Sequence, residues 1–317
     1  MAEISVWYTS PDGCLRELEG VQSLKLVRGV DAPCDALSVY YFCDKKPEEA
    51  VTLTVMYKKK KLFFGYADTQ REEREGDGIK GFIYARSSAC LLVDSEAEPS
   101  DFFCPSASSL FYVFASAEGF HSSLPALVSE HEYTVTRGTS LYGAVNNYVS
   151  GLEGKNIIVT PENELVLNYG EKVRIIERSR VLSEKRLINR GGLISRIDCK
   201  DATERRYRRH IKSRFLEERG IRSTRKASLA SLPQWQRDSV LKSRITSAAS
   251  DYMRLVLRLD GLFDAQLYDK AEIEASPFAE GKQLYISGIS YFADKSGIVT
   301  ELALNETIDF KEIIYVD

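Results

Sequence analysis

The sequence contains few of the residues that most enzymes and metal proteins use for chemistry. Only three of its 317 residues are histidines, His121, His131 and His210, and none is paired with a cysteine at metal-ligand spacing. The six cysteines are scattered and include no C-x-x-C pair, which indicates reduced, mostly buried thiols rather than a disulfide framework. We therefore predict no catalytic residue, no metal site and no cofactor.

Long apolar runs are also missing. No run approaches the roughly 18 residues that a membrane-spanning helix needs. The first residues, MAEISVWYTS, lack the basic and apolar regions of a secretion signal. The formal net charge is only -3, so the overall composition indicates neither a membrane nor a nucleic-acid partner. We expect a globular protein that stays in a cytoplasm until it is assembled or released.

The clearest local signal is a long β-hairpin followed by a short helix, over residues 62–95. Side chains alternate along 62–66 on the outward strand and along 79–86 on the return strand. The charged tip, 71–77, ends in Asp-Gly, which is typical of a tight turn. Beyond the return strand the apolar period becomes helical. The hairpin therefore predicts a β-domain that ends near residue 95.

Strand patterns also fill the residues before this hairpin. Each segment is short, rich in β-branched or aromatic residues and bounded by turn signals. The segments are Ile4–Tyr8, Ser23–Val27, Leu37–Phe42 and Val51–Tyr57. About six closely spaced strands predict a small antiparallel barrel or sandwich over residues 1–95.

The middle of the chain, residues 96–170, changes character. It begins with a link that contains proline and acidic residues, Glu96–Ser106. Helical spacing follows over 107–118 and 140–152, and 157–167 is typical of a hairpin. This mixture predicts a small α+β insert domain.

Strand patterns resume over residues 171–317, interrupted by a basic segment and a predicted helix at 233–251. Four segments of each half occur in the same order, with a charged turn in each hairpin. Unrelated antiparallel domains could share this order by chance, but the pattern favours duplication of one β-domain. The segments are LSVYYF, VTLTVMY, KLFFGYADTQ and IKGFIYA in the first half and YMRLVLRL, KAEIEA, QLYISGISYF and IVTELAL in the second.

This order of segments resembles that of bacteriophage baseplate hub proteins, the late control protein D family, with relatives in defective prophages and phage-tail-like bacteriocins. The resemblance implies an α+β, mainly β fold: two tail-tube-like antiparallel β-barrel domains with a small α+β insert between them. The matching segments are Gly81–Ser87, Leu91–Ser95, Ser140–Ser150, Asn163–Leu167, Arg254–Gly261, Leu284–Tyr291 and Thr300–Leu304.

The resemblance also implies a function. Hub proteins of this family are homotrimers whose six barrels match a sixfold tail tube and join it to a threefold spike. The implied partners are a second and third copy, a tail tube or tube-initiator protein, a spike protein and other baseplate proteins. The implied location is a virion or tail-like particle, with assembly in the bacterial host cytoplasm. No lysozyme or peptidase region is evident, so the resemblance implies a structural protein rather than an enzyme.

Two charged segments are candidate partner-binding surfaces. The hairpin tip carries Glu72, Glu73 and Arg74, which are either solvated or in contact with the next ring of a tail. The segment 204–226 has ten basic and three acidic residues, with Arg205, Arg206, Arg208 and Arg209 at its start. Its aromatic residues would suit nucleic acid, but the chain as a whole is acidic, so a solvated loop or a partner-facing surface is favoured.

The composition disfavours two other functional classes. A cell-wall-degrading hydrolase would need a nucleophile with a base nearby, and the isolated histidines make this unfavourable. A nucleic-acid-binding module would use 204–226 and bind more weakly as salt rises.

Overall fold

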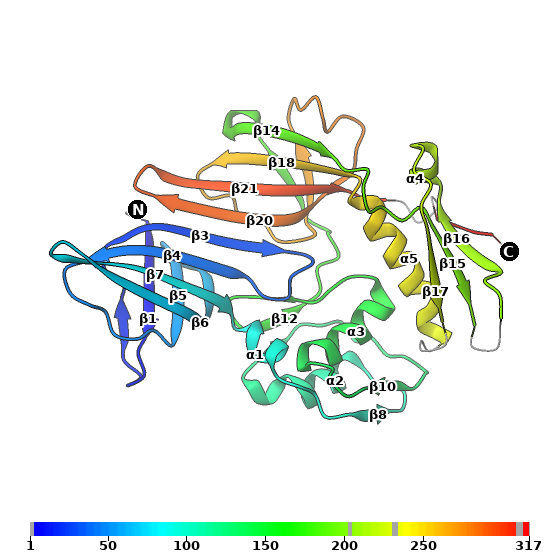
Figure 1. Cartoon of the computed structure of the whole chain (residues 1–317), viewed down its shortest axis with the longest axis horizontal. Helices are drawn as coiled ribbons and strands as arrows, with labels where there is room; N and C mark the ends of the chain where they lie inside the picture. Colours follow the sequence, from blue (N-terminus) through cyan, green and yellow to red (C-terminus); the bar gives the residue numbers. More distant parts are fainter. Residues whose placement is uncertain (1–2, 202–204, 230–233, 309–312, 317) are drawn as a thin grey trace.

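The structure is a computed structural model that describes residues 3–201, 205–229, 234–308 and 313–316. Strands dominate it, and most belong to one 13-stranded sheet that is antiparallel except between β13 and β19 (Figure 1). The insert lies below this sheet in the figure, and α5 with a second sheet lies at its right. The prediction of a mainly antiparallel β-fold with a few helices is confirmed.

The first half of the large sheet, which we call the N-terminal unit, has the strand order β3-β4-β7-β6-β5-β1, with β2 beside β1. Alternation explains the strands: Leu37, Val39 and Tyr41 of β4 are buried, and their neighbours point the other way. The strands are β1 (Ile4–Thr9), β2 (Leu15–Glu17), β3 (Val21–Gly29), β4 (Ala36–Cys43), β5 (Thr52–Tyr57), β6 (Lys60–Glu75) and β7 (Gly78–Ser87).

The second half, the C-terminal unit, has the order β14-β18-β21-β20-β19-β13. This is the order of the N-terminal unit strand for strand, so the predicted repeat is present in the pairing. One difference is that β13 runs parallel to β19, whereas β1 is antiparallel to β5. The strands are β13 (Val173–Ile176), β14 (Val181–Ile188), β18 (Met253–Asp260), β19 (Lys270–Ile273), β20 (Leu284–Asp294) and β21 (Gly297–Glu306).

The two units also share their register, including irregularities. Each central hairpin has a two-residue turn, between Glu75 and Gly78 and between Asp294 and Gly297. Each outward strand has one extra residue, a β-bulge, seven positions before its turn: Asp68 in β6 and Ser287 in β20. A further pair of bulges matches in β3, at Gln22, and in β14, at Leu182. Agreement at two unpaired residues supports duplication more strongly than strand order alone.

The units are joined edge to edge, because β3 pairs with the second half of β20. One hydrophobic core runs under both units and includes Leu26, Val55, Leu257 and Leu302, all completely buried or nearly so. Burial of each such side chain contributes about 1.5–3 kcal/mol. Among the described strands the pairing closes neither unit into a barrel.

The insert has a separate hydrophobic cluster around Leu110, Tyr148 and Leu165. Ser106 caps α2 through a capping box with Ser109, and α3 ends at Gly154, whose φ is +69°. The predicted helices and hairpin are present, and the boundaries at 95 and 170 stay predictions. The elements are α1 (Ala89–Asp94), β8 (Ser100–Phe102), α2 (Ala107–Phe114), η1 (Ser116–Glu118), β9 (His121–Ser122), β10 (Tyr133–Val135), α3 (Leu141–Glu153), β11 (Ile158–Val159) and β12 (Glu164–Val166).

The basic segment corrects one expectation, since it is no connecting loop. It supplies two strands and a short helix to a four-stranded sheet in which Ile211 and Ser213 are buried and Arg209 is exposed. Position 204 lies outside the described residues, as does the predicted helix start at 233. The elements are η2 (Arg178–Arg180), β15 (Arg196–Lys200), β16 (Arg209–Ser213), α4 (Arg214–Glu218), β17 (Thr224–Ser228), α5 (Gln234–Ser250) and β22 (Ile313–Val316).

Candidate functional site

The tip of the β6–β7 hairpin presents an open strand edge. β5 pairs with β6 only as far as Tyr66, and β6 continues for nine residues beyond it. From Asp68 to Glu75 the outer edge of β6 therefore has no strand partner in the described part of the chain. Glu72, Glu73 and Arg74 lie along this edge, at the left end of the sheet in Figure 1.

These three side chains are not equivalent. Glu72 is half-buried and accepts hydrogen bonds from Tyr41 Oη at 3.1 Å and Gln70 Nε2 at 2.8 Å, and it pairs with Lys46 Nζ at 3.3 Å. Burial, together with this carboxylate, raises the pKa of Tyr41. Glu73 and Arg74 are exposed and make no ion pair within the described residues. They are available to another molecule.

A second open edge belongs to β14, which pairs on one side with β18 and has no other strand partner among the described residues. It exposes apolar side chains: Leu182 is 59% exposed, Leu187 40% and Ile188 49%. Between them lie Glu184, Lys185 and Arg186. From sequence alone only Leu187–Ile188 has the apolar character of a strand, because the charged run Glu184–Arg186 hides the alternation of the rest.

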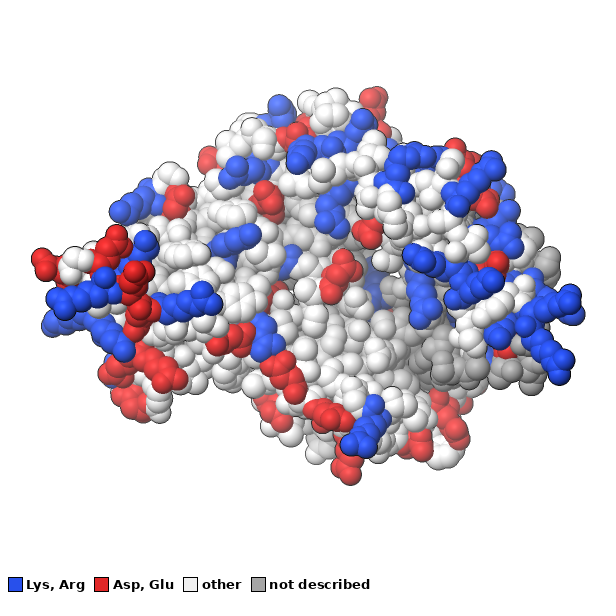
Figure 2. All heavy atoms as spheres, viewed as in Figure 1, with Lys and Arg blue, Asp and Glu red and all other residues white. Residues whose placement is uncertain are grey.

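The basic residues lie elsewhere. Arg205, Arg206, Arg208 and Arg209 are all exposed beside the four-stranded sheet, and Arg209 reaches Asp201 at 3.4 Å. Figure 2 shows Lys and Arg gathered at the right end, over β15–β17, and charges of both signs at the hairpin tip on the left. The two predicted surfaces are therefore at opposite ends of the molecule and form no single site.

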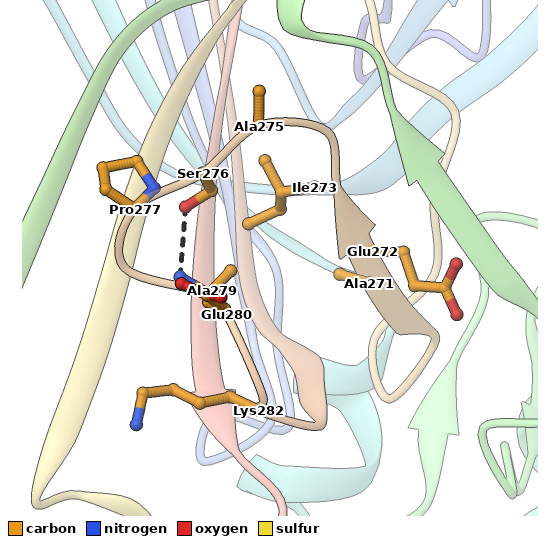
Figure 3. Close-up of a pocket in the computed structure, with 9 residues that line it drawn as sticks. All are labelled: Ala271, Glu272, Ile273, Ala275, Ser276, Pro277, Ala279, Glu280 and Lys282. Atoms are coloured by element: carbon orange, nitrogen blue, oxygen red, sulfur yellow. Dashed lines mark hydrogen bonds between the residues drawn. The ribbon is translucent and has the colours of Figure 1, made fainter.

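One hollow of the described surface has a serine hydroxyl in its lining. A cavity of about 510 Å³ lies beside β19 and the loop that follows it (Figure 3). Its hydroxyl, Ser276 Oγ, accepts from the backbone N–H groups of Phe278 and Ala279 and donates to Glu184. The Ser276 hydroxyl therefore stabilises the loop through these hydrogen bonds.

No group of three or more His, Cys, Asp or Glu side chains among the described residues could hold a metal ion. No helix in the described ranges is long and apolar enough to cross a membrane.

Comparison with known proteins identifies the fold. No protein-family model and no curated protein sequence matches the chain. Among solved structures, it is similar to the 43 kDa tail protein of prophage MuSo2 from Shewanella oneidensis, with a TM-score of 0.79 and 11% identity over 98% of this chain and 99% of that one.

Two more structures extend the comparison. A tail protein from Neisseria meningitidis matches with a TM-score of 0.71 and 12% identity over 96% of each chain. An E. coli component of the type VI secretion system, itself described as similar to the T4 bacteriophage tail proteins gp27 and gp5, matches with a TM-score of 0.58 and 7% identity over 92% of this chain and 74% of that one. The chain therefore has the fold of phage and prophage tail proteins.

Proposed function

We propose that this chain is a structural hub of a phage tail or tail-like particle: a homotrimer that joins a sixfold tail tube to a threefold spike. The observation that carries the proposal is the repeat within one chain. Two units with the same strand order, register and bulges are joined edge to edge by β3 and β20. Three such chains would present six similar units, which is the number that a sixfold tube requires.

The proposed partners are those that the family resemblance implies: a tail tube or tube-initiator protein, a spike protein and other baseplate proteins. The protein would be found in the virion or particle, after assembly in the cytoplasm of the bacterial host. The fold shared with the Shewanella and Neisseria tail proteins supports this location.

The exposed arginines 205, 206, 208 and 209 are proposed as a second contact surface, for an acidic neighbour. Tyr207 supports this, because its ring lies 5.0 Å from Lys200 Nζ and 5.4 Å from Lys226 Nζ, so cationic groups lie close together on one face. A nucleic-acid partner would instead give binding whose strength falls steeply with salt.

Purified particles test the proposal. The full chain, carrying a small epitope tag, is expected at the end of the tube in electron micrographs and in complexes with the tube and spike proteins. Deletion of its gene should leave host cells without assembled tails, and a variant with all four arginines replaced by alanine should assemble poorly. Particles that form normally without the chain would contradict the hub function.

A further inference from the structure

The junction within the chain provides a template for a contact between chains. β20 pairs with β19 at its first residues and with β3 beyond its bulge, from Gly288 opposite Gly29 to Asp294 opposite Ser23. On the corresponding edge, the equivalent strand of the N-terminal unit, β6, pairs with β5 at its first residues, and beyond its bulge that edge has no strand partner among the described residues. The counterpart of β3 is β14, whose outer edge is also open.

We infer that the outer edge of β6 in one copy pairs, antiparallel, with the outer edge of β14 in a second copy of this chain, in the register of the β3–β20 junction. The inference rests on the proposed function, since it names the contact that would join the copies. It is specific, because shared turns and bulges fix which residues correspond. Glu75 corresponds to Asp294, and Ser183 to Ser23, so Glu75 faces Ser183.

This register brings opposite charges face to face. Counting along both strands from Glu75 and Ser183 gives three successive facing pairs: Arg74 with Glu184, Glu73 with Lys185, and Glu72 with Arg186. Directly opposite residues of an antiparallel pair lie within reach of each other, and opposite charges there are favourable. Three complementary pairs are not a requirement of the fold, because the corresponding residues at the β3–β20 junction are mostly apolar. A shift of one residue would break all three pairs.

The same two edges cannot meet within one chain. Six strands of the sheet, β18, β21, β20, β3, β4 and β7, separate β14 from β6. At the usual strand spacing this is roughly 30 Å along the sheet. The partner must therefore be another copy. Since each copy offers one edge of each kind, the contact is head-to-tail and generates a ring where the rotation closes.

Among the described residues, no backbone hydrogen bond is made to the outer edge of β6 beyond Ala67. The loop between β4 and β5 contacts this part of β6 through side chains: Gln70 accepts from Ala50 N–H and donates to Glu48 O, and Glu72 pairs with Lys46. The corresponding loop of the C-terminal unit, which follows Asp260, coexists with the β3–β20 pairing.

Disulfide trapping in the full chain tests the register. The exposed thiols Cys14 and Cys104 are first replaced by serine. One preparation carries Glu73→Cys and another Lys185→Cys, and the two are mixed and oxidised. A disulfide between chains is expected in the mixture and in neither protein alone, because facing Cα atoms lie within disulfide range. The matched control carries Lys80→Cys in place of Glu73→Cys. Lys80 lies opposite Glu73 on β7 and is one strand farther from the partner, so this cysteine should form no disulfide with Lys185→Cys.

Charge exchange gives a second measurement on the same contact. Glu73→Lys or Lys185→Glu alone is expected to weaken self-association by about two- to fivefold, and the double variant to restore it. Lys295→Glu, in the turn of the hairpin whose edge β3 already covers, should have no effect.

The possible failures are distinguishable. A trimer in which the 73–185 pair stays reduced, or reacts no better than the control, would overturn the strand pairing and leave the hub function standing. A chain that stays monomeric at every concentration would also overturn the pairing. A specific disulfide in a chain that is absent from particles would retain the pairing and contradict the hub function.

Discussion

The two β-units have one backbone plan but different surfaces where a neighbouring strand joins. At the β3–β20 junction the residues that face the core are apolar and buried. Their counterparts on the open edges are charged. The first set is Leu24, Leu26, Tyr291 and Ala293, and the second is Glu184, Arg186, Glu72 and Arg74. A strand junction that forms within the chain during folding can be apolar. An apolar edge that stayed exposed to water until a partner bound would promote aggregation.

The bulges differ in the same way. In the N-terminal unit the extra residue, Asp68, forms an ion pair with Arg86 on β7 at 2.6 Å, and both are partly exposed. In the C-terminal unit, Ser287 at the same position donates to Asn305 Oδ1 at 2.7 Å, and both are buried. The two units share the position of the bulge. The bulge residue is charged where it is partly exposed, and it is a neutral hydroxyl where it is buried.

The largest effect is expected from Leu26→Ala at the covered junction. Leu26 is completely buried opposite Tyr291, so its truncation should lower the free energy of unfolding by about 2–5 kcal/mol. Arg186→Ala, at the equivalent position of β14, should change it by no more than about 0.5 kcal/mol. Urea unfolding of both variants measures the difference. If the two variants lost equal amounts of unfolding free energy, the β14 edge would already be covered in the isolated chain.

A smaller effect is expected from Gly81→Ala on β7. A Cβ built there lies 1.9 Å from Cζ of Tyr41, and overpacking of this kind costs about 1–3 kcal/mol. In the C-terminal unit the same positions hold Thr300 and Leu259. Tyr41→Leu should therefore reduce the cost of Gly81→Ala, which thermal unfolding of both singles and the double would measure. If the stability losses of the two single variants simply added in the double variant, residues 41 and 81 would not be packed against each other.

The smallest effect is an acid sensitivity of the contact between Arg86 on β7 and Asp94 at the end of α1. Hydrogen bonding from Arg86 lowers the pKa of Asp94 below its ordinary value of 3.8. The stability it contributes is thus present above pH 3.8 and is lost as the pH falls through the lowered pKa. Arg86→Gln should return the pKa of Asp94 toward 3.8 in an NMR titration. Ser287→Ala is the control and should leave the pKa of Asp94 unchanged. An Asp94 pKa that is the same with and without Arg86 would refute the assignment.

Much of the fold could be predicted from the sequence because the signals are local. Alternation marked the central strands, Asp-Gly marked the first hairpin turn, and the helices of the insert followed their apolar spacing. The order of strands was enough to reveal the repeat. These features depend on residues close together in the chain.

What sequence reasoning missed depends on pairing between distant residues. The union of the two units through β3 and β20 joins residues more than 250 positions apart, and their local patterns are satisfied by any apolar partner. Val181–Ile188 gives a strand signal only at its apolar end, because the charges of Glu184–Arg186 hide the alternation of the rest. The strands within 204–226 give no clear sequence signal, because the charges of this segment outnumber the few residues, such as Ile211, that its strands bury. Its predicted role as a contact surface remains a proposal, as does that of the hairpin tip.

The matched bulges have a mechanical consequence. An ordinary hairpin can slip by two residues and still keep every side chain on its own face. In these hairpins the tight turn fixes one end and the extra residue, Asp68 or Ser287, fixes the other, so a slip would misplace the bulge. The number of paired residues between the turn and the bulge is therefore the same in both hairpins. Each hairpin therefore presents its outer edge to a docking strand with its residues in one fixed alignment.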